Sequence, residues 1–398
     1  MPGKANRESS NGKLSDVLII GGGMAGSTAA AVLARRGIRV VLVDRWETYP
    51  VCFKAEKIES DQAILLRKFD LLDTVLPWAA SIREVLRAQD GRIIRRVTTE
   101  QYGIFYHDMV NAIRGSLPPS VERKIGRVEH IENSDTVQTV SLTSGEVYQT
   151  RLVLVAAGVG GDFQARLGLQ KNMIQKEQSF AAGFNIERRD GRPFDFDSIT
   201  YYPTGSDSRI AFLTLFQIGK TMRANLFACW SNNEERARDF VRNPTQELAH
   251  WLPQLTDLTG PFDITGKLET GRIDLYQMER PARPGMVLVG DAFQSVCPIT
   301  GTGLSKVLTD VDVLSECLPQ WLATPGMSDS KIASFYENRR KREVDSDSIA
   351  SARYARQIST DDSLGWRFRR AQWHWENRFG EALAHLARAT TAAVLISR

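Results

Sequence analysis

The sequence predicts an α/β fold in which a parallel sheet covered by helices carries an inserted antiparallel sheet and is followed by C-terminal helices. Residues 16–44 have the pattern of a buried strand, a glycine-rich turn, a helix and a second buried strand, which is the order of a βαβ unit. From Ser179 to about Trp230 the pattern changes to alternating, aromatic-rich strands, which are typical of an antiparallel sheet. The 398 residues are enough for two such domains.

The βαβ unit begins with Asp16–Ile20, a short apolar run that suits a buried parallel strand. Ser27–Arg36 is rich in alanine and leucine and predicts a helix, which Gly37 is placed to end. Arg39–Val43 is the second strand, and Asp44 follows it. The unit therefore places a glycine-rich turn and an acidic residue at the same edge of the sheet.

The later elements are predicted from apolar spacing and turn residues. In the first part of the chain we expect helices at Gln62–Leu76 and Tyr106–Leu117, two strands within Ile82–Val97 around Asp90-Gly91, and a hairpin of Val137–Leu142 and Val147–Val155. In the second part we expect strands at Ile199–Pro203, Ile210–Gln217, Met222–Trp230 and Met286–Val289, and helices at Gly301–Leu318, Lys331–Ser346 and Trp366–Ile396.

These elements predict a nucleotide-binding domain that is interrupted by a substrate domain. The predicted parts are a flexible tail at 1–15, the nucleotide-binding domain at 16–178 and 280–345, the substrate domain at 179–279, and a C-terminal helical segment at 346–398. Residues 82–98 are strands that can join the substrate sheet.

Composition excludes several classes of protein. The net charge is +4, and the six arginines and two glutamates from Gly365 to Arg398 account for it, so no broad nucleic-acid surface is predicted. Met1–Ser15 lacks the apolar core of a signal peptide, and no run reaches the roughly 18 apolar residues of a membrane span. The four cysteines form no Cys-x-x-Cys pair, and the five histidines have no metal-ligand spacing, so we expect a cytoplasmic protein without a disulfide framework or metal site.

The glycine-rich turn predicts a bound dinucleotide. Gly21 permits a tight turn, Gly23 lets the backbone approach a pyrophosphate, and Gly26 lets the helix pack on the strand. The N–H groups at the helix start, at Met24 and Ala25, favour phosphate, and Asp44 can accept hydrogen bonds from a ribose. An acidic residue at this position does not separate NAD from FAD.

A second motif favours FAD. Gly290-Asp291 follows a buried strand, and an aspartate there can hold the ribityl chain of a flavin. The helix that opens at Gly301, Thr302, Gly303 and Leu304 would point its N-terminus at the isoalloxazine, where its dipole favours the negative charge of reduced flavin.

With these motifs the chain resembles the para-hydroxybenzoate-hydroxylase-like FAD enzymes, which include aromatic hydroxylases, geranylgeranyl reductases and flavin halogenases. Further segments similar to the family are Lys54–Glu59 with Leu65-Leu66-Arg67, the flavin motif through Pro298 and Asp310, and Phe335-Tyr336 with Arg339-Arg340. The resemblance implies a Rossmann-type FAD-binding domain with an inserted antiparallel-sheet substrate domain. It also implies FAD contacts by Arg45, Lys54 and Gly158.

The chain departs from the family at the motif that serves flavin and NAD(P)H together. The family's Ala-Asp-Gly-x-x-Ser-x-x-Arg is replaced here by Ala156-Ala157-Gly158 and Val159–Gln164. The usual helix arginine is replaced by Tyr106, with His107 beside it, while Gln294 and Ser305 replace a common histidine and asparagine. NADH or NADPH remains a possible electron donor, but we expect direct reduction to be slow, and a separate flavin reductase is the alternative.

The resemblance implies a monooxygenase in which a flavin hydroperoxide transfers one oxygen atom to a small aromatic or heteroaromatic substrate. The catalytic candidates are Pro298, Thr300, Gly301 and His107, and the substrate-lining candidates on the alternating strands are Tyr201, Phe212, Leu215 and Trp230. Alternation alone does not tell which face of that sheet is turned to the flavin.

Other functions stay open at this point. The altered NAD(P)H motif also suits an FAD-dependent reductase or dehydrogenase of a lipid or isoprenoid. Trp373-His374-Trp375 is similar to the Trp-x-Trp of flavin halogenases but lacks the residues that follow it there. A non-catalytic FAD-binding redox sensor is a further alternative. The arginine- and tryptophan-rich C-terminal helix is expected to pack on the protein's own body or in a homodimer rather than on a membrane surface.

Overall fold

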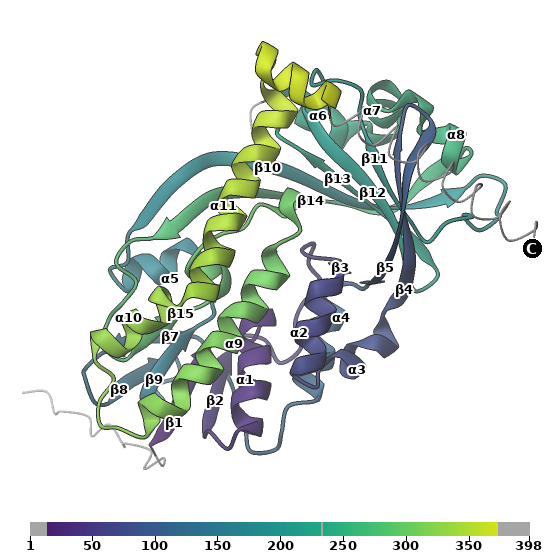
Figure 1. Ribbon diagram of the computed structural model, residues 1–398. Coiled ribbons are helices and arrows are strands. Elements are labelled where there is room, and N and C mark those ends of the chain that lie inside the picture. Colours follow the sequence, from purple (N-terminus) through teal and green to yellow (C-terminus); the bar gives the residue numbers. More distant parts are fainter. Residues whose placement is uncertain (1–13, 232–233, 373–398) are drawn as a thin grey trace, which may run out of the picture.

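A computed structural model of the chain describes residues 14–231 and 234–372. These residues form two sheets that lie on either side of a set of helices (Figure 1). Among them, no helix has the length and apolar character needed to cross a lipid bilayer.

The first sheet is parallel at its centre and contains the predicted βαβ unit. Its strand order is β6-β2-β1-β9-β8-β7, with β15 also paired to β9. The strands are β1 (Ser15–Ile20), β2 (Val40–Asp44), β6 (Glu122–Ile125), β7 (Val128–Glu132), β8 (Gln138–Leu142), β9 (Val147–Val155) and β15 (Met286–Leu288). The predicted hairpin is confirmed as β8 and β9, which pair antiparallel.

Both faces of this sheet are covered, because its central strands are apolar on both sides. Helices cover one face. Val17 and Ile19 of β1 pack against α1 (Met24–Arg35), α4 (Tyr106–Gly115) and α9 (Gly303–Leu322), whereas Leu18 and Ile20 pack against β7 and β8. The same helical layer includes α2 (Ser60–Lys68), α3 (Leu72–Val75) and α10 (Asp329–Glu337), and α5 (Gly161–Arg166) follows β9.

The second sheet has the order β14-β10-β13-β12-β11-β4-β5-β3 and is mostly antiparallel. Its strands are β3 (Lys57–Ile58), β4 (Ala80–Gln89), β5 (Arg92–Gly103), β10 (Lys171–Arg188), β11 (Ser198–Tyr202), β12 (Ile210–Ile218), β13 (Thr221–Ala228) and β14 (Phe262–Met278). The strands at 80–103 therefore belong to this sheet, where β4 pairs parallel with β11. The long strands β10 and β14 extend from it toward the first sheet (Figure 1).

Helices also cover the outer face of the second sheet. These are α6 (Glu235–Arg242), α7 (Pro244–Trp251) and α8 (Thr256–Thr259), which pack on a core that includes Phe180, Phe184 and Trp230. Short 3-10 turns complete the chain as η1 (Leu76–Trp78), η2 (Pro253–Leu255), η3 (Gly290–Ala292) and η4 (Pro298–Thr300).

The predicted single helix at Lys331–Ser346 is wrong, because α10 ends and α11 (Arg339–Thr360) begins at Asn338. The Asn338 side chain accepts hydrogen bonds from the backbone N–H groups of Arg340 and Lys341, at 3.0 and 3.4 Å, and so caps a new helix. The helix predicted at Gln62–Leu76 is likewise divided, into α2 and α3, at Asp70 with its positive φ of 54°. Residues 364–372 are helical, and the rest of the predicted C-terminal helix lies outside the described residues.

Candidate cofactor and substrate site

A cavity of about 800 Å³ opens where β1, β2 and β9 end, at the N-terminus of α1. The glycines of the first turn shape its floor. Gly21 has a φ of +102°, and a Cβ there would lie 2.5 Å from the Ala156 carbonyl oxygen. A Cβ on Gly26 would lie 1.8 Å from the Gly21 carbonyl oxygen, so α1 can approach β1 only without a side chain at this position. The backbone thus lines a trough that leads to the helix N-terminus.

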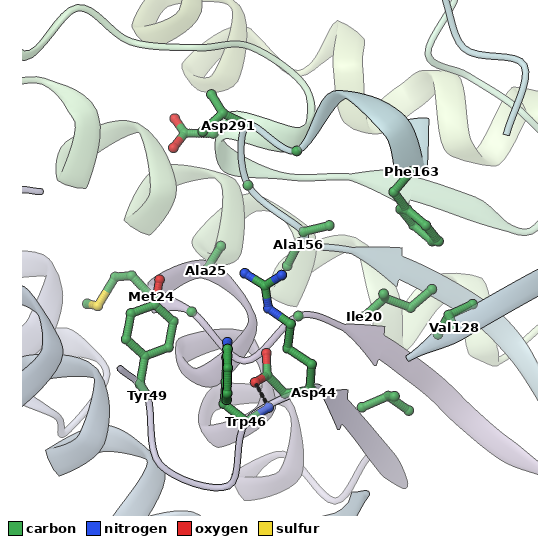
Figure 2. Close-up of a pocket in the computed structure, with 18 of the residues that line it drawn as sticks. Ile20, Met24, Ala25, Asp44, Trp46, Tyr49, Val128, Ala156, Phe163 and Asp291 are labelled. Carbon is green, nitrogen blue, oxygen red and sulfur yellow. Dashed lines mark hydrogen bonds between the residues drawn. The ribbon is translucent and has the colours of Figure 1, made fainter. Parts of the chain in front are cut away.

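Asp44, the last residue of β2, lines the cavity and is held by two backbone N–H groups. One carboxylate oxygen accepts a hydrogen bond from the Gly22 N–H at 2.6 Å, and the other accepts one from the Trp46 N–H at 2.8 Å. Arg114 of α4 lies 3.2 Å from Asp44 and is only 3% exposed. Figure 2 shows Asp44 and Asp291 on opposite sides of Met24 and Ala25, with Trp46 beside Asp44. The cavity therefore offers acidic groups at two separate points along its length.

Cationic and phenolic side chains gather between those points, at the start of α1. The Tyr106 hydroxyl accepts a hydrogen bond from the Met24 N–H at 3.3 Å, and Tyr49 packs edge-on against the Tyr106 ring at 5.6 Å. The Lys54 ammonium lies 5.3 Å from the centre of the Tyr106 ring. Tyr106, Tyr49 and Asp291 raise the pKa of Lys54 above its ordinary value, so this side chain is a permanent cation at the helix N-terminus. An anionic group fits here.

Nine of the residues predicted to bind a cofactor line this cavity: Gly21, Gly23, Met24, Ala25, Asp44, Arg45, Lys54, Gly158 and Asp291. Sequence reasoning did not assign cavity positions to several others, including Trp46, Tyr49, Arg127, Phe163 and Arg166. Trp46 and Tyr49 come directly after β2, and this position at the strand's carboxyl end is the signal that could have identified them.

The sequence matches the family described as FAD binding domain over residues 14–346. The chain belongs to this family. The resemblance to the para-hydroxybenzoate-hydroxylase-like FAD enzymes is confirmed, and the protein is an FAD-dependent oxidoreductase.

Individual relatives are distant. The protein is 25% identical to 3-demethoxyubiquinol 3-hydroxylase of Escherichia coli (strain K12), over 76% of this chain and 79% of the relative. It is 26% identical to squalene monooxygenase 1,2 of Brassica napus, over 76% of this chain and 61% of the relative. The structure of p-nitrophenol 4-monooxygenase PnpA from Pseudomonas putida DLL-E4 superposes with a TM-score of 0.74 and 17% identity, covering 94% of this chain and 98% of that chain. The last likeness shows the shared fold.

The cavity fits FAD on its own geometry. Gly21 and Gly23 line it without side chains, the start of α1 lies beside Lys54, and Asp44 and Asp291 lie on opposite sides of that helix start (Figure 2). A dinucleotide has its phosphates in the middle and hydroxyl-bearing sugars on either side, which is the same order of groups.

The second flavin motif forms a separate turn in front of α9. Pro298 and Thr300 lie in η4, Gly301 and Thr302 follow it, and Gly303 and Leu304 begin α9. The Gly301 carbonyl accepts a hydrogen bond from Gln62 at 3.0 Å, which also donates to Ser305 at 3.0 Å. The N-terminus of α9 is thereby tied to α2.

His107 does not line the FAD cavity. Its ring stacks on Phe105 at 5.5 Å, and Nε2 lies 3.6 Å from the Asp108 carboxylate. The side chain therefore lies outside the cavity lining, and its proposed acid–base role has no support from the cavity geometry.

Three of the four predicted substrate-lining residues lie on the other face of the sheet. Tyr201, Leu215 and Trp230 are buried in the core under α6, α7 and α8, and the Trp230 indole N–H donates to the Ser208 carbonyl at 2.7 Å. The three side chains therefore face away from η4. Phe212 lies on the face turned to η4, where it packs with Cys297 and Ile299.

Phe212 belongs to a row of half-buried aromatic rings on that inner face. Its ring centre lies 6.0 Å from that of Tyr202 and 5.1 Å from that of Phe227, so β11, β12 and β13 each contribute one ring. Alternation predicts Tyr202 and Phe227 as readily as the residues beside them, but only the structure assigns the face.

A buried ion cluster joins the segment around Lys54 to the second sheet. Arg223 of β13 donates two hydrogen bonds to Glu56, at 2.8 and 2.9 Å, and one to Glu269 of β14 at 2.7 Å. Its guanidinium lies between the rings of Phe53 and Phe105, 5.5 and 5.6 Å from their centres. The cluster holds the FAD-cavity segment and the sheet together through side chains that are 3% and 1% exposed for Arg223 and Glu56.

Proposed function

We propose that the enzyme is an FAD-dependent monooxygenase that inserts one oxygen atom into a small aromatic substrate. The observation that carries the proposal is the aromatic row of Tyr202, Phe212 and Phe227, in which Phe212 and Phe227 pack with Cys297 and with Ile299 of η4. Bound FAD supplies the oxygen-transfer chemistry, as the family's cofactor does. Aromatic rings bind a planar apolar substrate with little loss of side-chain entropy, and they exclude water from the place of reaction.

In this proposal Gly21, Gly23 and Asp44 would hold the adenosine end of FAD, the start of α1 with Lys54 would hold its phosphates, and Asp291 would hold its ribityl chain. The flavin ring then faces Pro298, Thr300 and the N-terminus of α9. That helix end favours negative charge on the reduced ring, and the sheet face with the aromatic row covers the substrate.

Incorporation of labelled oxygen tests the reaction. FAD-loaded protein with an added reductant and ¹⁸O₂ should place one label in a phenolic or aminophenolic product, detected by mass spectrometry. Phe212→Ala should raise KM by roughly tenfold because a ring of the proposed pocket is lost. The matched control is Phe194→Ala, a half-buried ring packed against the core on the outer face of the same sheet. Reduction of a lipid double bond without oxygen uptake would favour the reductase alternative.

Removal of the Asp44 carboxylate should weaken FAD binding. Asp44→Ala loses an acceptor for the ribose and leaves buried Arg114 without its carboxylate partner, so we expect FAD affinity to fall by about 1–3 kcal/mol. Titration of apoprotein with FAD, followed by flavin fluorescence, measures it. Asp16→Ala is the control, since Asp16 on β1 pairs with Arg39 outside the cavity. Equal affinity of Asp44→Ala and the parent would contradict the orientation.

Electron delivery is the second part of the proposal. Ala157 and Gly161 offer no side-chain hydrogen bond at the positions where the family's aspartate and serine help to place NAD(P)H. Direct reduction should therefore be slow or should use Arg45 and Lys54, which line the cavity. Anaerobic stopped-flow mixing with NADH and NADPH measures the rate. Rapid, saturable reduction would contradict the expected slow rate, and if Arg45→Ala and Lys54→Ala left it unchanged it would also contradict docking at these residues. Slow reduction that an added flavin reductase accelerates would support the proposal.

A further inference from the structure

Four charged side chains are buried together behind the turn that carries Asp291. Lys306 and Asp310 come from α9, and Lys341 and Asp345 come from α11. Lys306 lies 3.0 Å from Asp310 and 3.3 Å from Asp345, while Lys341 lies 2.7 Å from Asp310 and 3.1 Å from Asp345. Both lysines and Asp310 are at most 1% exposed, and the rings of Phe293 and Phe335 lie over Lys341.

Among the four charged side chains, the two from α9 are the ones that make hydrogen bonds to Gly290 in the described part of the chain. The Gly290 N–H donates to Asp310 at 2.8 Å, and the Lys306 ammonium lies 3.5 Å from the Gly290 carbonyl oxygen. Gly290 has a left-handed φ of +59°, so the backbone conformation of this glycine sets the direction of the chain at Asp291. The Asp291 carbonyl accepts a hydrogen bond from the Tyr276 hydroxyl at 2.8 Å. The backbone of Asp291 is thus fixed on both sides, and this residue lines the FAD cavity (Figure 2).

Stability alone does not account for the four charges. Each buried ion costs several kcal/mol of desolvation, and well-packed apolar residues of the same size are often at least as stabilising. Burial by itself would raise the pKa of Asp310, but Lys306 and Lys341, together with the Gly290 N–H, hold it below its ordinary value. Asp310 therefore stays an anion, which is the strongest acceptor for the Gly290 N–H.

We propose that Lys306 and Asp310 are a positioning pair for FAD. Asp310 holds the peptide group before the Gly290 Cα and Lys306 holds the one after it, and together they keep the Asp291 carboxylate in the geometry that binds the ribityl chain. Lys341 and Asp345 balance their charge. The inference rests on the proposed role of Asp291. It places Asp310, which lies outside the cavity lining, among the residues on which FAD affinity depends.

Two charge-neutral double variants test the pair. Lys306→Met/Asp310→Leu removes the groups that touch Gly290, and Lys341→Met/Asp345→Leu removes the other lysine and aspartate of the same cluster. FAD affinity of the apoproteins is measured by fluorescence titration, and their stability by thermal unfolding. We expect the first variant to bind FAD at least roughly tenfold more weakly than the parent and the second to stay within about threefold, at similar unfolding temperatures. Lys306→Gln/Asp310→Asn, closer in shape, serves if the first variant does not fold.

A cycle with Asp291→Ala separates positioning from a general loss of structure. If the pair acts through Asp291, adding Lys306→Met/Asp310→Leu to Asp291→Ala should weaken FAD binding no further. Additive losses, or equal losses in the two double variants, would overturn the proposal. If Asp291→Ala itself binds FAD as well as the parent does, the assigned role of Asp291 fails, which is a different outcome from failure of the pair.

Discussion

Arg223→Met is expected to destabilise the protein by about 3–5 kcal/mol, because it leaves Glu56 and Glu269 without the guanidinium that pairs with both. Urea or thermal unfolding at pH 8 measures the loss. Arg209→Met is the matched control: Arg209 pairs with Glu234 at the surface of the same sheet and is 45% exposed, so its removal should cost less than about 1 kcal/mol.

The stability that Arg223→Met loses should be smaller at low pH than at high pH. Burial already raises the pKa of Glu56 above its ordinary value of 4.5, although Arg223 opposes the shift. Without Arg223 the folded protein takes up a proton at Glu56 more readily than the unfolded chain does. The cost of keeping Glu56 ionised in the variant is therefore absent below its ordinary pKa and grows as the pH rises to its raised pKa. Arg223→Met should lose less stability at pH 5 than at pH 8. Adding Glu56→Gln should restore part of the loss at pH 8, and no restoration would argue against the buried carboxylate as its cause.

The FAD cavity was largely predictable because its residues are close in sequence and each has a specific backbone task. The strand, the turn of Gly21–Gly26, the helix and Asp44 follow one another within 30 residues, and the structure brings them to one edge of the sheet as a βαβ unit must. The same holds for Asp291, since a Gly-Asp pair after a buried strand falls at that edge through the parallel pairing of β15 with β9.

The alternation of apolar residues did not predict which face of the second sheet is turned to η4. Both faces of the second sheet are covered, so β13 is buried at Met222, Arg223, Ala224, Asn225 and Leu226 in succession and has no polar side to mark the exterior. Alternation leaves two equivalent registers, so it does not separate Tyr201, Leu215 and Trp230, which pack under the outer helices, from Phe212, which packs beside η4.

The buried ion clusters were also beyond the sequence. Arg223 and Glu56 are 167 positions apart, and Lys341 and Asp310 are 31 apart, so no local spacing links the partners. Each of these charged residues alone is most simply read as a surface residue. Only the packing of α9, α11 and the two sheets shows that they are paired and buried.

Gly26→Ala is expected to have the largest effect on cofactor binding, a loss of FAD affinity of about a hundredfold or more, which corresponds to roughly 2.7 kcal/mol. The new Cβ would lie 1.8 Å from the Gly21 carbonyl oxygen and 3.2 Å from a methyl carbon of Ile19. Since real Cβ atoms do not approach so closely, α1 and the turn must separate, and the trough lined by Gly21 and Gly23 changes shape. Apoprotein titration with FAD measures the affinity, and circular dichroism shows whether the fold persists. Gly115→Ala at the end of α4 is the matched control, because a Cβ there meets no atom within 4 Å. Gly26→Ala binding FAD as tightly as Gly115→Ala would show that this turn does not carry the cofactor.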